Sequence, residues 1–174
     1  MSRLAILLLC GLLAGNARAE WYAFSQAGYD DGATLSGKFE AKDLNNDGWI
    51  SGSVFTNFAE IQDFYFSFSG NSLVPAFSET FADLSVLDYQ PSRSVLGDQN
   101  PEGIAVNWFA ETGFTYVTGA GVNGQQGGDI IDWSTGMNTH SGDLVSVSAV
   151  PEPAIWLFWL AGWPALALRL RHAR

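Results

Sequence analysis

Apolar and polar residues alternate along several short stretches of the chain. The clearest is 64–68, where three phenylalanines are separated by a tyrosine and a serine, and a second is 104–108. A period of two places every other side chain on the same face of an extended strand. Both stretches are therefore predicted to be half-buried β-strands. Similar patterns predict further strands near 21–25, 33–40, 82–87, 113–118, 129–133 and 143–148.

Residues that favour turns separate these stretches. Glycine, asparagine and aspartate gather at 70–71, at 97–100 and at 121–128. We find no repeat of fixed period, no heptads and no long amphipathic helix. Many short strands joined by turns are typical of antiparallel sandwiches. We therefore expect an all-β domain, an antiparallel β-sandwich with jelly-roll-like winding, over residues 20–149.

The first residues have the pattern of a secretory signal peptide. Arg3 precedes an apolar run, 4–13, and the small residues Ala17 and Ala19 lie two apart before a glutamate. This pattern predicts a signal peptide over 1–19 with cleavage after Ala19, and so an exported domain. The alternative is a buried N-terminal helix. The only cysteine, Cys10, lies in this segment, so the exported domain has no thiol for a disulfide or a metal.

The exported domain is strongly acidic. Between residues 20 and 150 the basic residues are Lys38, Lys42 and Arg93, against seventeen acidic ones, a net charge of −14. Such a field repels phosphate backbones, so we expect no nucleic-acid partner. It favours divalent cations, basic partners, or neutral sugars that are bound by hydrogen bonds and aromatic rings.

The last 25 residues, 150–174, have a different character. An apolar helix over 154–168 is predicted to be about 22 Å long, shorter than the bilayer core of about 30 Å, so it can only just span a membrane. A basic tail over 169–174 should stay cytoplasmic, with Arg169, Arg171 and Arg174 as the membrane stop. We therefore expect a temporary tether rather than a permanent anchor.

A short motif, Pro151-Glu152-Pro153, precedes this helix. Two prolines that flank one residue keep the backbone extended and exposed, as a processing enzyme requires. The alternative is an ordinary linker before a weak membrane anchor.

The order of motif, short helix and arginines in 150–174 resembles the PEP-CTERM sorting signal. The resemblance implies that residues 151–153 are recognised by exosortase, a membrane transpeptidase of Gram-negative bacteria that make exopolysaccharide. It also implies a transient tether in the inner membrane, followed by release to the cell surface or the extracellular matrix of a biofilm. It implies no enzymatic activity for this chain, which would be the substrate.

A calcium-type loop is predicted at "DLNNDGWIS", residues 43–51. The candidate ligands are the side chains of Asp43, Asn45 and Asp47, the main-chain carbonyl of Trp49 and the hydroxyl of Ser51. Oxygens at alternate positions, with a glycine at the sharp turn, resemble the first nine positions of an EF-hand or dockerin-like loop, which binds Ca²⁺.

The twelfth position of this loop, where a bidentate acid is expected, is Val54. Glu60 or Asp63 is a candidate for the missing ligand, and 54–61 is predicted to form a short helix. The alternative is a loop of Asx turns around Asn-Asp-Gly that needs no ion.

Signs of catalytic chemistry are weak in the exported domain. His140, its only histidine, lies in the turn-like 137–143 and is predicted to be a surface loop residue rather than a base. The glycines of 119–128 lack the lysine of a phosphate loop. We therefore expect no enzyme. The alternative is a secreted carbohydrate-active enzyme with a carboxylate pair that the sequence does not identify.

Four aromatic residues are candidates for stacking on sugar rings, and the alternative for each is core packing. They are Trp49, Trp108, Tyr116 and Trp133. The leading hypothesis is a non-catalytic surface or matrix protein that binds polysaccharide or other proteins.

Overall fold

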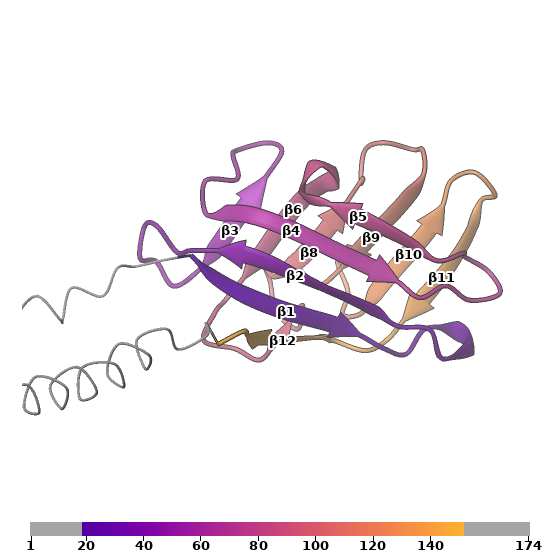
Figure 1. The fold of residues 1–174 in the computed structure, drawn as a ribbon, viewed down its shortest axis with the longest axis horizontal. Coiled ribbons are helices and arrows are strands. Elements are labelled where there is room, and N and C mark those ends of the chain that lie inside the picture. Colours follow the sequence, from indigo (N-terminus) through magenta and orange to yellow (C-terminus); the bar gives the residue numbers. More distant parts are fainter. Residues whose placement is uncertain (1–18, 152–174) are drawn as a thin grey trace, which may run out of the picture.

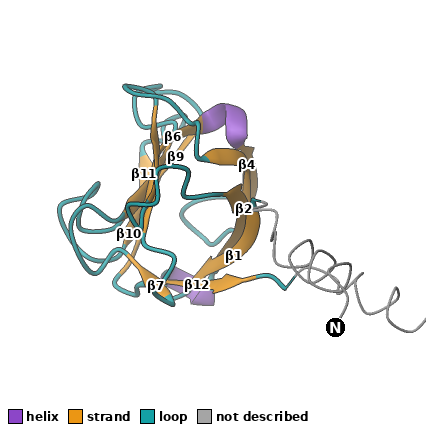
Figure 2. Cartoon of the chain, turned by 90° about the vertical axis from the view of Figure 1, so that its left-hand side faces the viewer, coloured by secondary structure: helices purple, strands orange, loops and turns teal. Residues whose placement is uncertain are grey.

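The computed structural model describes residues 19–151, which form two antiparallel six-stranded sheets. The first sheet has the order β5-β4-β2-β1-β12-β7, and the second has the order β11-β10-β9-β8-β6-β3. The two sheets face each other (Figure 2), so the expectation of an all-β antiparallel fold is confirmed. The strands are β1 (Glu20–Gln26), β2 (Leu35–Ala41), β3 (Ile50–Ser53), β4 (Ile61–Phe68), β5 (Phe77–Thr80), β6 (Leu84–Tyr89), β7 (Val95–Leu96), β8 (Gly103–Val106), β9 (Phe114–Thr118), β10 (Gly128–Asp132), β11 (Met137–Ser141) and β12 (Val145–Ala149). Two 3-10 turns, η1 (Asp30–Gly32) and η2 (Phe81–Asp83), complete the described elements.

Alternation in β4 sets one face of the core. Phe64, Phe66 and Phe68 are at most 2% exposed, whereas Tyr65 on the opposite face is 42% exposed. Aromatic rings from neighbouring strands continue this layer, and Phe24 of β1 stacks on Phe64 at 5.7 Å between ring centroids. Each such side chain contributes roughly 1.5–3 kcal/mol on burial. The period-two pattern of 64–68 thus places the aromatic core.

Other segments differ from what their sequences predict. The stretch 54–61, expected to be a helix, forms turns before β4 begins at Ile61. Asn57 accepts the amide of Ala59 through its side chain, an Asx turn that competes with helix. Strand β8 is buried on both faces, because Ala105 packs outward against a small cluster that Val122 partly covers.

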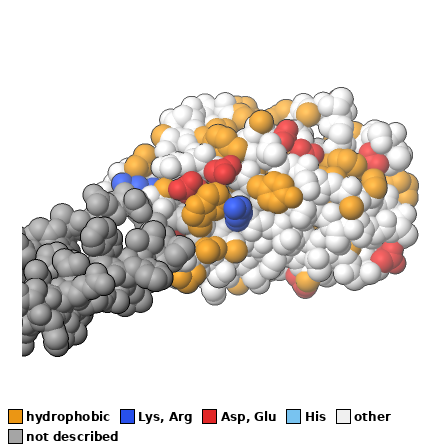
Figure 3. Space-filling view, in the orientation of Figure 1, with side chains coloured by type: hydrophobic (Ala, Val, Ile, Leu, Met, Phe, Trp, Pro, Cys, Tyr) orange, Lys and Arg blue, Asp and Glu red, His pale blue; other side chains and the backbone are white. Residues whose placement is uncertain are grey.

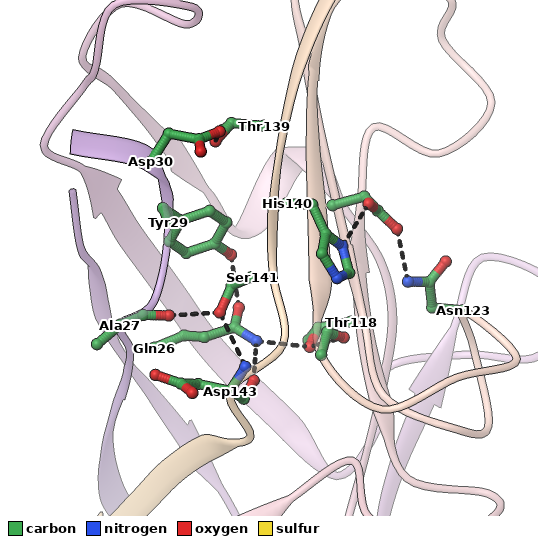
Figure 4. Close-up of polar contacts among 12 residues, drawn as sticks. Gln26, Ala27, Tyr29, Asp30, Thr118, Asn123, Thr139, His140, Ser141 and Asp143 are labelled. Carbon is green, nitrogen blue, oxygen red and sulfur yellow. Dashed lines mark hydrogen bonds and ion pairs between the residues drawn. The ribbon is translucent and has the colours of Figure 1, made fainter. Parts of the chain in front are cut away.

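A buried polar cluster joins the two sheets (Figure 4). Gln26 of β1 is 1% exposed, and its amide oxygen accepts hydrogen bonds from the hydroxyls of Tyr29 at 2.6 Å and Tyr116 at 2.9 Å. Its amide nitrogen donates to Thr118 Oγ1 at 3.3 Å and to the carbonyl of Asp143 at 2.7 Å. Since a glutamine amide has two donors and two acceptor sites, this side chain is fully satisfied.

The two ends of the described chain lie on the same side of the domain (Figure 1). The amide of Val150 donates to the carbonyl of Trp21 at 2.7 Å, one step after the end of β12. None of the helices between residues 19 and 151 has the length and apolar character of a membrane span. The predicted signal peptide, apart from Ala19, the predicted apolar helix 154–168 and the basic tail 169–174 fall outside the described residues.

Candidate ligand-binding surfaces

The calcium-type loop connects β2 to β3. Asp43 Oδ2 accepts the amide of Gly48 at 2.8 Å, Asn45 Oδ1 accepts that of Asp47 at 2.9 Å, and Asp47 Oδ1 accepts that of Trp49 at 2.8 Å. The side chains of Asp43, Asn45 and Asp47 therefore accept backbone amides two to five residues further along the chain. The loop is held by its own hydrogen bonds, as the alternative of Asx turns predicts.

Glu60, and not Asp63, reaches this loop. The Glu60 side chain accepts the amide of Leu44 at 2.9 Å through Oε1 and the amide of Ser51 at 2.9 Å through Oε2. Asp63 instead accepts the amide of Phe64. The buried Glu60 carboxylate thus ties the start of the loop to its end.

One carboxylate oxygen of the loop has no partner within residues 19–151. Asp43 Oδ1 is buried and makes no hydrogen bond to any of these residues, while Oδ2 of the same group accepts the amide of Gly48. An unpaired buried oxygen is costly, and a cation would satisfy it. Carbonyl and carboxylate oxygens that already accept one amide keep a second lone pair. The side-chain oxygens of Asp43, Asn45 and Asp47 are of the type that Ca²⁺ prefers. Among the described residues, however, no three His, Cys, Asp or Glu side chains gather as a metal group.

A second surface is an exposed aromatic patch made of Val54, Phe55, Trp108 and Phe109. Phe55 is 74% exposed, Phe109 57% and Trp108 38%. Phe109 lies between the other two rings, edge-on to Phe55 at 5.2 Å and stacked on Trp108 at 5.5 Å between centroids. Exposed apolar patches of this kind mark interaction sites.

The aromatic patch is formed by two loops that meet at one residue. The amide of Val54, after β3, donates to the carbonyl of Ser85, and the amide of Trp108, after β8, donates to the Ser85 hydroxyl. Asn107, with a positive φ of 50°, turns the chain out of β8 directly before the rings. Sequence reasoning identified Trp108 but missed Phe55 and Phe109, because it placed Phe55 on a helix.

The other stacking candidates have different surroundings. Tyr116 is fully buried and packs on Phe66 at 5.4 Å, so of its two predicted roles core packing is confirmed and sugar stacking is excluded. Trp133 is 41% exposed, and its Nε1 donates to Thr115 Oγ1 at 2.8 Å. Trp49 is half-buried and belongs to the calcium-type loop itself. Trp108 is the candidate that lies among other exposed rings.

In each of two carboxyl clusters, burial raises the pKa of one glutamate above its usual range. Burial, followed by a hydrogen bond shared with Asp83, raises the pKa of Glu79 to about 7. Glu79 lies on β5 and Asp83 in η2, so the two carboxyl groups come from consecutive elements of the chain.

The second carboxyl cluster lies in the segment of the chain that connects β6 to β8. Burial raises the pKa of the fully buried Glu102, while the amide of Gly97, which donates to it at 3.0 Å, acts in the opposite direction. Arg93 pairs with Asp98 and lies 3.8 Å from Glu102 through its Nε. The guanidinium of Arg93 thus lies within ion-pair distance of two carboxyl groups in this connecting segment.

His140 lies on β11 rather than in a loop (Figure 4). Its Nδ1 is 2.9 Å from Asp129 Oδ1, and the other oxygen of Asp129 accepts the side-chain amide of Asn123 at 2.8 Å. The neighbouring Ser141 points to the opposite face, where its hydroxyl donates to the carbonyl of Ala27. Alternation along the strand therefore separates this histidine from the adjacent serine.

Of the sorting motif 151–153, the described residues include only Pro151, which is exposed. The remaining sorting residues, Glu152 and Pro153, and the membrane-stop arginines lie outside the described residues. No family model, no curated protein and no solved structure matches the chain.

Proposed function

We propose that the chain is a non-catalytic exported protein of the bacterial surface or biofilm matrix, and that it binds polysaccharide. The aromatic patch carries this proposal. Phe55, Trp108 and Phe109 present apolar faces to solvent on loops, and rings in this arrangement can pack against the apolar faces of sugars. The net charge of −14 over residues 20–150 favours a ligand without negative charge.

Removing the rings tests this function. We expect the double variant Trp108→Ala/Phe109→Ala to bind the polysaccharide of the matrix at least about tenfold more weakly, because aromatic anchors dominate contact energies. Affinity electrophoresis in gels that contain the isolated matrix polysaccharide measures the change. Met137→Ala, which removes an apolar side chain that is 43% exposed from β11, is the control and should bind as the wild type does. Equal binding by all three proteins would rule out the patch as the binding surface.

We further propose that the C-terminal segment directs sorting, as its resemblance to the PEP-CTERM signal implies. The last strand ends at Ala149 and Pro151 is exposed, so the first residue of the motif lies outside the sheet. The partner in this step is an exosortase-type membrane transpeptidase, and the membrane holds the apolar helix until processing.

Expression with and without the transpeptidase tests sorting. With the enzyme, mass spectrometry should show a mature C-terminus that lacks residues 156–174, and without the enzyme these residues should remain. The variant Pro151→Ala/Glu152→Ala/Pro153→Ala should keep them in both hosts, because the extended recognition element is lost. If residues 156–174 of the wild type persist in both hosts, the tether is not transient.

Calcium binding at residues 43–51 is a second candidate activity, favoured by the unpaired Asp43 Oδ1. The jelly-roll-like winding also stays a prediction. It is supported by the path of the chain, which changes sheet after β2, β3, β5, β6, β7 and β11.

A further inference from the structure

The outer face of the first sheet has a row of serine side chains that crosses five strands. Cross-strand partners in register are Ser67 with Ser78, Ser36 with Ser67, Ser25 with Ser36, and Ser25 with Ser146. Neighbouring strands lie about 4.8 Å apart, so the row is about 19 Å long. It runs across the strands and presents one uncharged hydroxyl on each of them.

A groove of 270 Å³ lies beside this row. Its floor includes Ala23, whose cross-strand partners are Lys38 on β2 and Ser148 on β12. Because alanine is short, the surface is hollowed between these two longer side chains. The hydroxyl groups that line the groove belong to Ser25, Ser36, Ser146 and Ser148.

Aromatic side chains lie on the same face around Lys38, whose cross-strand partners are Tyr65 on β4 and Ala23 on β1. Tyr65 is 42% exposed and its hydroxyl donates to Ser78 at 3.3 Å, at the far end of the serine row. Trp21 lies beneath the ammonium group of Lys38, which is 4.3 Å from the ring centroid. In Figure 3 one basic side chain lies between two apolar groups on this face, and a wide uncharged area extends beside them.

The charges on this face select the ligand. The serine row and the groove carry no acid, and the ammonium of Lys38 is already engaged by a ring. Glu40 and Asp63 are cross-strand partners at the edge of the face, and the domain as a whole is acidic. An anionic polymer is therefore repelled, whereas a neutral polymer with many hydroxyl groups can exchange hydrogen bonds with the serines.

We propose that this groove binds a chain of neutral polysaccharide that lies across β2, β1 and β12. The serine hydroxyls donate to and accept from the sugar hydroxyls, and Tyr65 packs against a ring where the chain continues over β4. The inference rests on the proposed function and adds a contact surface separate from the aromatic patch. A domain with both surfaces can hold two chains and so link them in a matrix.

Serine-to-valine replacement tests the groove. The variant Ser25→Val/Ser36→Val/Ser146→Val removes three exposed hydroxyls and keeps residues that favour strands. Ala23→Gln fills the groove floor by an independent change. The probes are hydroxyethylcellulose, dextran and laminarin, with carboxymethylcellulose as the anionic counterpart of the first. Affinity electrophoresis measures binding, and Asn138→Val on the exposed side of β11 is the control.

We expect the wild type to bind at least one neutral probe and to bind carboxymethylcellulose more weakly than hydroxyethylcellulose. Both groove variants should bind at least tenfold more weakly, with the control unchanged. If the groove variants bind like the wild type while Trp108→Ala/Phe109→Ala loses binding, the groove is wrong and the proposed function stands. If the wild type binds none of the neutral probes, the groove is wrong; if it also fails to bind the isolated matrix polysaccharide, the proposed function is wrong as well. Should the triple variant not fold, as thermal melting would show, Ala23→Gln alone decides.

Discussion

Replacing Gln26 by alanine should lower the free energy of unfolding by about 3–5 kcal/mol, because several buried polar groups lose their partners at once. The hydroxyls of Tyr29 and Tyr116 would lose their acceptor, and Thr118 would lose a donor. The space left by the side chain adds a cavity cost. Urea denaturation of wild type and variant measures the difference.

A matched change elsewhere shows whether this loss is specific. Gln125→Ala removes the same side chain from the exposed loop between β9 and β10, and it should change stability by at most about 0.5 kcal/mol. Gln26→Glu keeps the acceptors but loses the donors to Thr118 and Asp143, so its stability should lie below that of the wild type. If Gln26→Ala is as stable as Gln125→Ala, the polar cluster does not join the sheets energetically.

The fold was predictable wherever one face of a strand is apolar and the other polar. Phe64, Phe66 and Phe68 give that signal because they all point into the core, and the neighbouring Tyr65 and Ser67 do not. The strand β11 gives no such signal. Its inward residues, Thr139 and Ser141, are polar and satisfied by distant groups, Asp30 and Ala27 respectively. A short stretch of sequence around β11 does not include those partners, so it predicts a turn where the structure has a strand.

The candidate sites also differ in how much of each could be predicted, because some combine neighbouring residues and others combine residues far apart in sequence. The loop 43–51 was predictable because its ligand types and its glycine are adjacent in sequence, and short-range hydrogen bonds hold it. The sequence could not show whether Glu60 or Asp63 contacts the loop, because that depends on how the chain returns beside the loop at the start of β4. The aromatic patch combines Phe55 with Phe109, which are separated by 54 positions, and the serine row requires the register of five strands. These contacts are set by tertiary structure, which local patterns do not contain.

Calcium should raise the melting temperature of the domain by about 8 °C when its concentration is about 100-fold above the dissociation constant. Such an excess stabilises a protein by about 2.7 kcal/mol, and each kcal/mol shifts the midpoint of a domain of this size by roughly 3 °C. The physical reason is the buried Asp43 Oδ1, which has no hydrogen-bond partner among the described residues and lies in a loop rich in oxygen side chains. Thermal melting in EDTA, in calcium and in magnesium measures the effect.

Two variants separate calcium binding from loop structure. Asp43→Ala/Asp47→Ala removes both carboxylates and should abolish the calcium shift, but it also removes acceptors for the amides of Gly48 and Trp49. Asp43→Asn/Asp47→Asn keeps an acceptor oxygen at each position, so it should melt like the wild type in EDTA and respond little to calcium. A wild type whose melting is unaffected by calcium, or an asparagine variant that responds equally, would mean that Asx turns and the clamp by Glu60 alone shape this loop.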